Sequence, residues 1–351
     1  MPDSDNPHDN PRHLRNWWLT PLVGAVGGYL ASLIGWPLPW VIGSLLAVIL
    51  LRCSGVLSQE MPGGRQVGQW LVAAGIGLHF TSEVLEQVLG NLTIILLGAF
   101  ATLALSAIGI AGLRRCGVDR ATAFFASMPG GASEMVNLSR RHGAQPARIA
   151  AAHSVRLLMV ILLIPALFTW GLPPVEPAPA MPVDWFWLAI LLPAGALLAL
   201  LWRHLGQPNP WMLGPLTLCA AASVTFDLHI GMPGWLGQAG QWLIGCALGC
   251  HFDRAFFRSA PGFLLRVILF TLLAMIVTAL LGSAIGWASG IESVSLMLGM
   301  MPGGITELCL TAEALQLSVA LVTALQALRL FLVMFLAEPL FRLWQRHSPL
   351  P

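Results

Sequence analysis

MPGGASE, at residues 128–134, returns as MPGGITE at residues 301–307. Each copy therefore carries a glutamate, Glu134 or Glu307, three positions after its second glycine. Further matches recur at offsets of 171 to 173 positions: Pro39-Trp40 with Pro210-Trp211, Gln69-Trp70 with Gln241-Trp242, His79-Phe80 with His251-Phe252, and Arg156 with Arg329. An offset that stays nearly constant along a chain indicates an internal duplication, and this decides how the rest of the sequence is interpreted.

The composition indicates the environment of the chain. Of the 351 residues, 56% are hydrophobic and 10% are charged, whereas a soluble domain carries about 25% charged residues. Apolar runs of about 20 residues recur throughout, and a helix of that length crosses the roughly 30 Å hydrocarbon core of a bilayer. The short alternating segments of a transmembrane β-barrel do not occur. The sequence therefore predicts an all-α integral membrane protein.

The apolar runs predict about ten transmembrane helices in two repeats, residues 17–170 and 185–346. Their expected ranges are 17–35, 39–53, 67–80, 90–113, 146–170, 185–203, 210–226, 238–252, 262–287 and 318–341. Two further segments, residues 118–142 and 292–316, are each broken at Pro-Gly-Gly. The break is expected because proline lacks an N–H and glycine favours non-helical backbone.

Arginine sets the expected orientation, since cytoplasmic loops are enriched in basic residues. All 18 basic residues are arginine, and none lies in the loops near 36–38, 81–89, 171–184, 227–237 and 288–317. We expect these loops outside, both termini in the cytoplasm, and broken segments that re-enter rather than cross. Residues 1–16 are expected to form a disordered cytoplasmic tail, and residues 171–184 an external linker. Five crossings per repeat give inverted-topology repeats, as in many secondary transporters.

The backbone at each break is a candidate binding site. The candidate residues here are two glycine pairs and two glutamates: Gly130, Gly131, Gly303, Gly304, Glu134 and Glu307. The amides that follow the glycines would open a half-helix, which favours an anion. The glutamates fall in the first turn of these half-helices, where the helix dipole stabilises a carboxylate. Each glutamate either caps its own helix or contributes to a binding site, and the sequence leaves both interpretations open.

Two arginines complete the candidate site. Arg156 and Arg329 would lie near the middle of their helices, where an arginine costs about 3 kcal/mol on insertion scales. Because such a residue needs a partner, we expect each arginine to pair with Glu134 or Glu307. The pairs either lock the broken segment to the next helix or form a site at which a substrate or a proton competes for the arginine.

The histidines and cysteines of the sequence indicate no metal site and no cofactor site. The six cysteines lie mostly in apolar runs and are interpreted as small buried hydrophobic residues. The nine histidines are scattered, without the clustered ligands that copper or iron would need. His153 lies one turn before Arg156, but its repeat mate is Gln326, so we expect its role to be confined to the first repeat.

The doubled Met-Pro-Gly-Gly segments with their glutamates, the Pro-Trp sequences at Pro39 and Pro210, and the late arginines resemble the AbrB duplication family of bacterial membrane proteins. The resemblance covers the chain beyond residue 17. Members of that family are commonly labelled regulators of gene expression or putative ammonia monooxygenases. Direct DNA binding would need a basic footprint and a groove-binding element, and a net charge of +2 with short loops provides neither.

These observations predict a bacterial inner-membrane protein that transports a small solute or ion through a site at the two breaks. The resemblance implies an alternative, a membrane protein that affects gene expression indirectly; a membrane monooxygenase is the third interpretation. The expected partners are the lipid bilayer and an unidentified small solute or ion, with no direct nucleic-acid contact, and a homo-oligomer is compatible with the sequence. No catalytic residue is assigned.

Overall fold

The computed structural model describes residues 17–56, 58–171 and 181–347, and within these residues every regular element is a helix. The helices of the first half are α1 (Leu19–Leu33), α2 (Pro39–Cys53), α3 (Gly64–Leu78), α4 (Ser82–Gly90), α5 (Leu92–Arg115), α6 (Arg120–Ser127), α7 (Ala132–Arg140) and α8 (Pro146–Gly171). Those of the second half are α9 (Trp185–His204), α10 (Pro210–Phe226), α11 (Gly234–Gly249), α12 (Arg254–Ser259), α13 (Pro261–Ser289), α14 (Ser293–Met300), α15 (Ile305–Ala314) and α16 (Val319–His347). The expected tail at 1–16 and most of the expected linker at 171–184 lie outside the described residues.

Length and composition of the helices indicate a membrane protein. Within the described ranges, five helices are long and apolar enough to cross a bilayer: α5, α8, α9, α13 and α16. The helices α1, α2 and α10 are apolar but shorter. Large apolar side chains also face outward, with Trp287 87% exposed and Phe335 69% exposed. Such surfaces suit lipid rather than water.

Most helix boundaries agree with the sequence prediction, and both predicted breaks are present. The break at Met128 separates α6 from α7, and the break at Met301 separates α14 from α15. Two short helices, α4 and α12, were not predicted. Each begins at a capping residue: Thr81 Oγ1 accepts from Val84 N at 3.4 Å, and Asp253 Oδ1 accepts from Phe256 N at 2.7 Å. Such caps favour a helix start within a loop.

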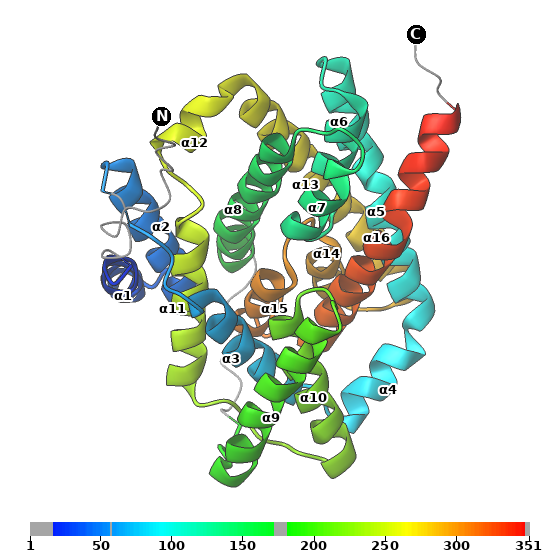
Figure 1. The fold of residues 1–351 in the computed structure, drawn as a ribbon. Coiled ribbons are helices and arrows are strands. Elements are labelled where there is room, and N and C mark those ends of the chain that lie inside the picture. Colours follow the sequence, from blue (N-terminus) through cyan, green and yellow to red (C-terminus); the bar gives the residue numbers. More distant parts are fainter. Residues whose placement is uncertain (1–16, 57, 172–180, 348–351) are drawn as a thin grey trace.

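The helices form two bundles (Figure 1). The first contains α1, α2 and α3 of the first half with α9, α10 and α11 of the second. The second contains α5 to α8 with α13 to α16, and the two broken segments lie inside it. The order and lengths of α1 to α8 recur in α9 to α16: three helices, a short helix, a long helix, two half-helices and a final long helix.

Packing within the first bundle is reciprocal between the halves. The helix α2 packs against α11, and α10 packs against α3. Two tryptophans make matching hydrogen bonds: Trp70 Nε1 donates to Leu192 O at 3.0 Å, and Trp242 Nε1 donates to Pro21 O at 2.9 Å. Each half therefore holds the first helix of the other half by the same contact.

The helices α3 and α11 cross where two small residues meet. A Cβ atom on Gly68 would lie 2.8 Å from the carbonyl oxygen of Gly240, and one on Gly240 would lie 2.9 Å from Val72. Close approach of backbones at glycine is a common way for membrane helices to pack. Because backbone cannot move aside as a side-chain tip can, this crossing leaves no room for a methyl group.

We predict that Gly68→Ala destabilises the protein by about 1–3 kcal/mol, because the added methyl overpacks the crossing. Gly75→Ala, on the same helix, is the matched control, since its Cβ would lie 3.6 Å from Met232, an ordinary contact. Thermal unfolding in detergent measures the difference. Equal melting temperatures for the two variants would contradict this account of the crossing.

Candidate functional site

The arginines bind the carbonyl ends of the broken helices. Arg156 Nη2 donates to Met128 O at 3.1 Å, and Nη1 donates to Ser127 O at 3.4 Å. Arg329 Nη1 donates to Met301 O at 2.7 Å, and Nη2 donates to Gly303 O at 2.7 Å. A broken helix in an apolar environment needs such donors, because carbonyls without a partner there cost several kcal/mol.

This geometry corrects the expected ion pairs. Among the ion pairs of the described residues, none joins Arg156 or Arg329 to Glu134 or Glu307. The carbonyl end of a helix carries about half a negative charge, so it competes with a carboxylate for the arginine. The guanidinium groups are held by backbone, and the glutamates lie at the opposite, amide ends of the breaks.

His153 and Gln326 assist the two arginines in the same way. His153 Nε2 lies 3.0 Å from Phe125 O, and its Nδ1 lies 2.7 Å from Arg156 Nη2. Gln326 Nε2 donates to Gly299 O at 2.6 Å, and its Oε1 accepts from Arg329. The expectation that the role of His153 is confined to the first repeat is therefore wrong.

The partners of His153 fix the form of its ring. A carbonyl can only accept and a guanidinium can only donate. Nε2 therefore carries the proton that bonds Phe125 O, while Nδ1 accepts from Arg156. A neutral imidazole with this tautomer offers the same donor and acceptor pair as a glutamine amide, which explains how Gln326 can replace it.

Each glutamate folds back over the glycine at the start of its helix. Glu134 and Glu307 occupy the third position of α7 and α15, whose N-cap residues are Gly131 and Gly304. A Cβ atom on either glycine would collide with the Oε2 atom of the glutamate that follows it. This placement agrees with the capping interpretation.

One cavity joins the two breaks. Its volume is about 340 Å³. All eight residues predicted for the site line it: Gly130, Gly131, Glu134, Arg156, Gly303, Gly304, Glu307 and Arg329. The equivalent residues of the two halves differ in burial. Glu307 is 9% and Arg329 is 3% exposed, whereas Glu134 and Arg156 are half-buried.

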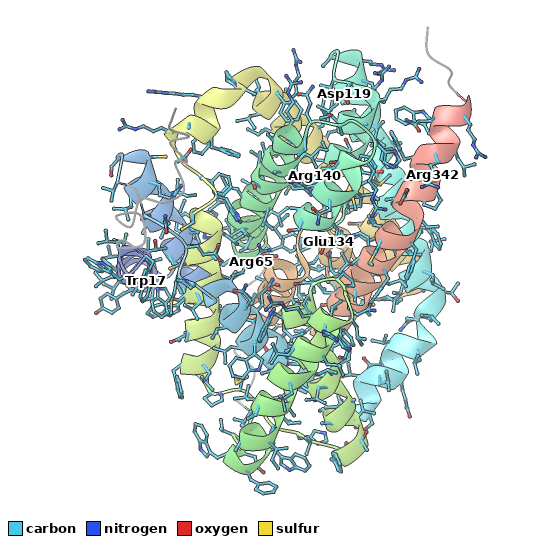
Figure 2. The ribbon with its side chains drawn as sticks, viewed as in Figure 1. Trp17, Arg65, Asp119, Glu134, Arg140 and Arg342 are labelled. Atoms are coloured by element: carbon cyan, nitrogen blue, oxygen red, sulfur yellow. The ribbon has the colours of Figure 1, made fainter. Side chains whose placement is uncertain are left out.

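The first bundle supplies a polar wall that sequence reasoning missed. Three residues at the start of α3 and three around the start of α10 line the cavity: Arg65, Gln66, Gln69, Asn209, Pro210 and Trp211. Figure 2 shows Arg65 and Glu134 near the middle of the molecule, whereas Arg140 and Arg342 lie toward its upper end. The recurring Gln-Trp and Pro-Trp sequences were the available signal, because they include three of these residues, Gln69, Pro210 and Trp211.

We predict that His153→Gln retains wild-type stability, because Gln326 makes the equivalent bonds in the second half of the chain. His153→Leu should lower stability by about 1–3 kcal/mol, since it leaves a buried carbonyl and an arginine short of a partner. Thermal unfolding of the purified variants measures both effects. His229→Leu, in an exposed loop, is the control, and equal losses for His153→Gln and His153→Leu would contradict the proposed equivalence.

Comparison with known proteins places these features in a family. A family model described as "Transition state regulatory protein AbrB" matches residues 40–345. "Uncharacterized protein YhjN" of Bacillus subtilis (strain 168) is 26% identical over 367 aligned positions, which cover 94% of this chain and 93% of that protein. "Putative regulator AbrB" of Escherichia coli (strain K12) is 26% identical over 338 positions, covering 92% of this chain and 94% of that protein. The match over nearly the whole chain, both breaks included, shows that this protein belongs to the AbrB family.

Proposed function

We propose that the chain is a secondary transporter of a small solute or ion in the bacterial inner membrane. One observation carries the proposal: two broken helices from the two halves of the chain line a single cavity together with five charged residues, Arg65, Glu134, Glu307, Arg156 and Arg329. Discontinuous helices that meet near the bilayer midplane form the substrate sites of many transporters. Charged side chains within membrane segments are functional candidates, because burying a charge in the bilayer costs free energy.

The proposed architecture is ten crossing helices and two re-entrant segments in two inverted repeats. The direction of α3 and α11 supports inversion. A Cβ atom on Gly64 of α3 would lie 3.8 Å from Leu243 of α11, and one on Gly240 of α11 would lie 2.9 Å from Val72 of α3. This order of contacts favours antiparallel helices. The crossing pair, Gly68 and Gly240, occupies equivalent positions in the repeats. A two-fold axis that exchanges antiparallel helices at such a point is perpendicular to both, and therefore lies in the membrane plane.

Arginine positions support an orientation with both termini in the cytoplasm. Arg140 and Arg342 lie toward the same end of the molecule in Figure 2. Arg65, at the start of α3, lines the cavity, and the positive-inside bias places the loop that precedes it in the cytoplasm. We propose that the structure represents an inward-facing state.

Unequal packing of the two second half-helices supports alternating access. In α15, residues 305–312 are all buried, and the helix packs against α3 and α8. Its Thr306 Oγ1 also contacts Met212 Sδ of α10 at 3.4 Å. In α7, the counterpart, only Met135 and Ser139 are buried. An outward-facing state would exchange these roles, with α7 against α11 and with Gln238 and Gln241 replacing Gln66 and Gln69 at the cavity.

A topology test uses the repeat-equivalent positions 141 and 314, both of which are exposed. In a background without native cysteines, we expect Arg141→Cys to react with a membrane-impermeant maleimide from the cytoplasmic side and Ala314→Cys from the opposite side. Right-side-out and inside-out vesicles distinguish the two. Labelling of both positions from one side would contradict the inverted repeats.

A transport test uses Glu307, the buried glutamate of the site. Purified protein in liposomes on a solid-supported membrane is exposed to a panel of small organic acids, amino acids and inorganic ions. We expect a transient current with a member of the panel, and a loss of at least about tenfold in Glu307→Gln, because a charged hydrogen-bond partner is worth about 1.5–3 kcal/mol.

The control for this test is Glu86→Gln, on the exposed surface of α4, which should transport at the wild-type rate. Insertion and melting temperature are measured for each variant. If Glu307→Gln lowers only the amount of protein in the membrane and leaves the transport rate per molecule unchanged, the residue has a scaffolding role and the transport proposal is contradicted.

Regulation of gene expression is a second candidate, supported by the name of one relative, "Putative regulator AbrB" of Escherichia coli (strain K12). A membrane protein of this kind would act indirectly, through the level of a solute that it moves or senses. The same Glu307→Gln variant distinguishes the two routes. Loss of both transport and the expression change indicates regulation through the solute, whereas loss of transport alone indicates a separate signalling role.

A further inference from the structure

The wall that the first bundle contributes to the cavity at the breaks consists of polar side chains without partners. A guanidinium, three amides and an indole N–H form it: Arg65, Gln66, Gln69, Asn209 and Trp211. Among residues 17–56, 58–171 and 181–347, no protein group forms a hydrogen bond or an ion pair with any of these five side chains. Their polar atoms are accessible to solvent, so they are open to a solute in the cavity.

Asn209 gives up a local hydrogen bond to line this wall. It is the N-cap residue of α10, a position at which an asparagine side chain usually accepts from a backbone N–H of the first turn. Here the side chain makes no capping bond, and it lines the cavity instead. Its amide is therefore available to a ligand.

The corresponding positions in the other half of the chain carry no polar side chain. The Gln-Trp sequences pair Arg65 with Gly237, and the Pro-Trp sequences pair Asn209 with Leu38. Neither Gly237 nor Leu38 lines the cavity. Leu38 has the same left-handed backbone as Asn209, with φ angles of 49° and 43°, so this backbone does not require a polar residue. At both pairs of positions, the polar residue is the one that lines the cavity.

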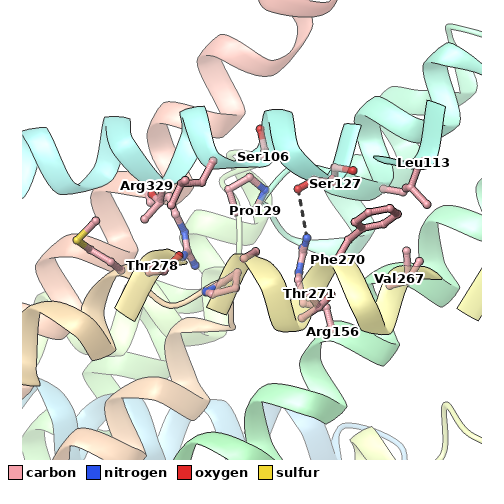
Figure 3. A pocket seen from close by; sticks show the side chains of 18 residues that line it. Ser106, Leu113, Ser127, Pro129, Arg156, Val267, Phe270, Thr271, Thr278 and Arg329 are labelled. Atoms are coloured by element: carbon pink, nitrogen blue, oxygen red, sulfur yellow. Dashed lines mark hydrogen bonds between the residues drawn. The ribbon is translucent and has the colours of Figure 1, made fainter. Parts of the chain in front are cut away.

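The arginines of the breaks, in contrast, are already bonded to backbone. Arg156 Nη1 donates to Ser127 O (Figure 3), and both Nη atoms of Arg329 donate to carbonyls. These two arginines also line a second, smaller cavity of about 60 Å³. Among the described residues that line the larger cavity, Arg65 is the arginine whose guanidinium makes no such bond.

We propose that the solute of the larger cavity is a small organic acid whose carboxylate binds Arg65. This inference names the substrate class of the site, and so it rests on the proposed function. A guanidinium presents its donors in a planar fork that matches the two oxygens of a carboxylate. The amides of Gln66, Gln69 and Asn209 each offer a donor and an acceptor, which suit hydroxyl, carbonyl or amino groups on the rest of the solute.

The size of the cavity supports an organic solute. Its volume of about 340 Å³ equals that of roughly eleven water molecules in the liquid, at about 30 Å³ each. An acid of up to about ten non-hydrogen atoms would fill this space. A single inorganic ion would leave most of the polar wall without a contact.

The glutamates of the site are compatible with an anionic solute. Glu134 and Glu307 each lie at the amide end of a half-helix, which carries about half a positive charge and so offsets much of the carboxylate. Glu60 and Glu307 attract Arg65 electrostatically, but neither forms an ion pair with it among the described residues. The guanidinium therefore still lacks a direct acceptor, which the solute would supply.

The first test measures binding to the purified full-length protein in detergent. Lactate, succinate, benzoate and alanine are each compared with their own amides at constant ionic strength. We expect at least one acid to raise the melting temperature by about 2–5 °C, because a ligand of the folded state adds stability. Its amide should bind at least about tenfold more weakly. No shift with any of the four acids, or equal shifts with acid and amide, would overturn the proposal.

Variants of Arg65 localise the binding. Arg65→Gln should raise the half-saturating concentration of the acid at least about tenfold, the equivalent of about 1.4 kcal/mol, and leave that of the amide unchanged. Arg65→Lys keeps the charge without the fork, so its affinity for the acid should lie between those of Arg65→Gln and the wild type. Arg203→Gln, an exposed arginine at the end of α9, is the matched control and should bind as the wild type does.

A purely structural role of Arg65 predicts a different result. Arg65→Gln would then change the melting temperature of the protein without ligand and keep the wild-type preference for acid over amide. That outcome would contradict the assignment of the carboxylate to Arg65.

Binding and transport are tested separately. Binding of an acid that depends on Arg65, without a current in liposomes, would support this inference and contradict transport. A current carried by a cation or an uncharged solute, with no acid bound, would support transport and rule out this inference.

Discussion

Interrupting a helix in an apolar environment leaves carbonyl and amide groups that must find partners, and in this chain arginine serves the carbonyls. Arg156 and Arg329 each reach from the following long helix to the end of a half-helix. The helix termini in turn stabilise the buried arginines, because the carbonyl end of a helix carries a partial negative charge. No acidic side chain is therefore needed to compensate the guanidinium groups. Break and arginine therefore stabilise each other, and neither is acceptable alone. The orientation of both half-helices, and with it the shape of the central cavity, depends on this contact.

The two halves of the chain share this interaction, while its details differ. A histidine in one half and a glutamine in the other complete the hydrogen bonding, since each presents one donor and one acceptor at the required spacing. Burial differs more strongly. Glu307 is enclosed whereas Glu134 is half-buried, although both occupy the same position in their helices. Equivalent sequence thus gives equivalent local structure, and the packing of the two bundles then makes the environments unequal.

Much of this could be predicted from the sequence, because hydrophobic runs and Pro-Gly-Gly breaks act locally. All eight candidate residues, which were chosen because their sequence pattern recurs in both halves, line one cavity. The partners of the arginines could not be predicted, because a carbonyl acceptor has no signature in a sequence and a nearby glutamate is the more visible choice. Arg65 and Asn209 were missed for a related reason. They reach the cavity through the relative position of two bundles, which no local pattern encodes.

The contact between Gly68 and Gly240 has a consequence for ancestry. Under the inverted arrangement proposed above, it is a residue touching its own counterpart, the hallmark of an isologous interface between identical subunits. A half-length ancestor carrying that glycine would have dimerised through this surface, one copy inserted in each direction. Fusion of the two copies would then have freed each to diverge in loop charge. The glycine pair would thus be a remnant of a homodimer preserved inside a single chain.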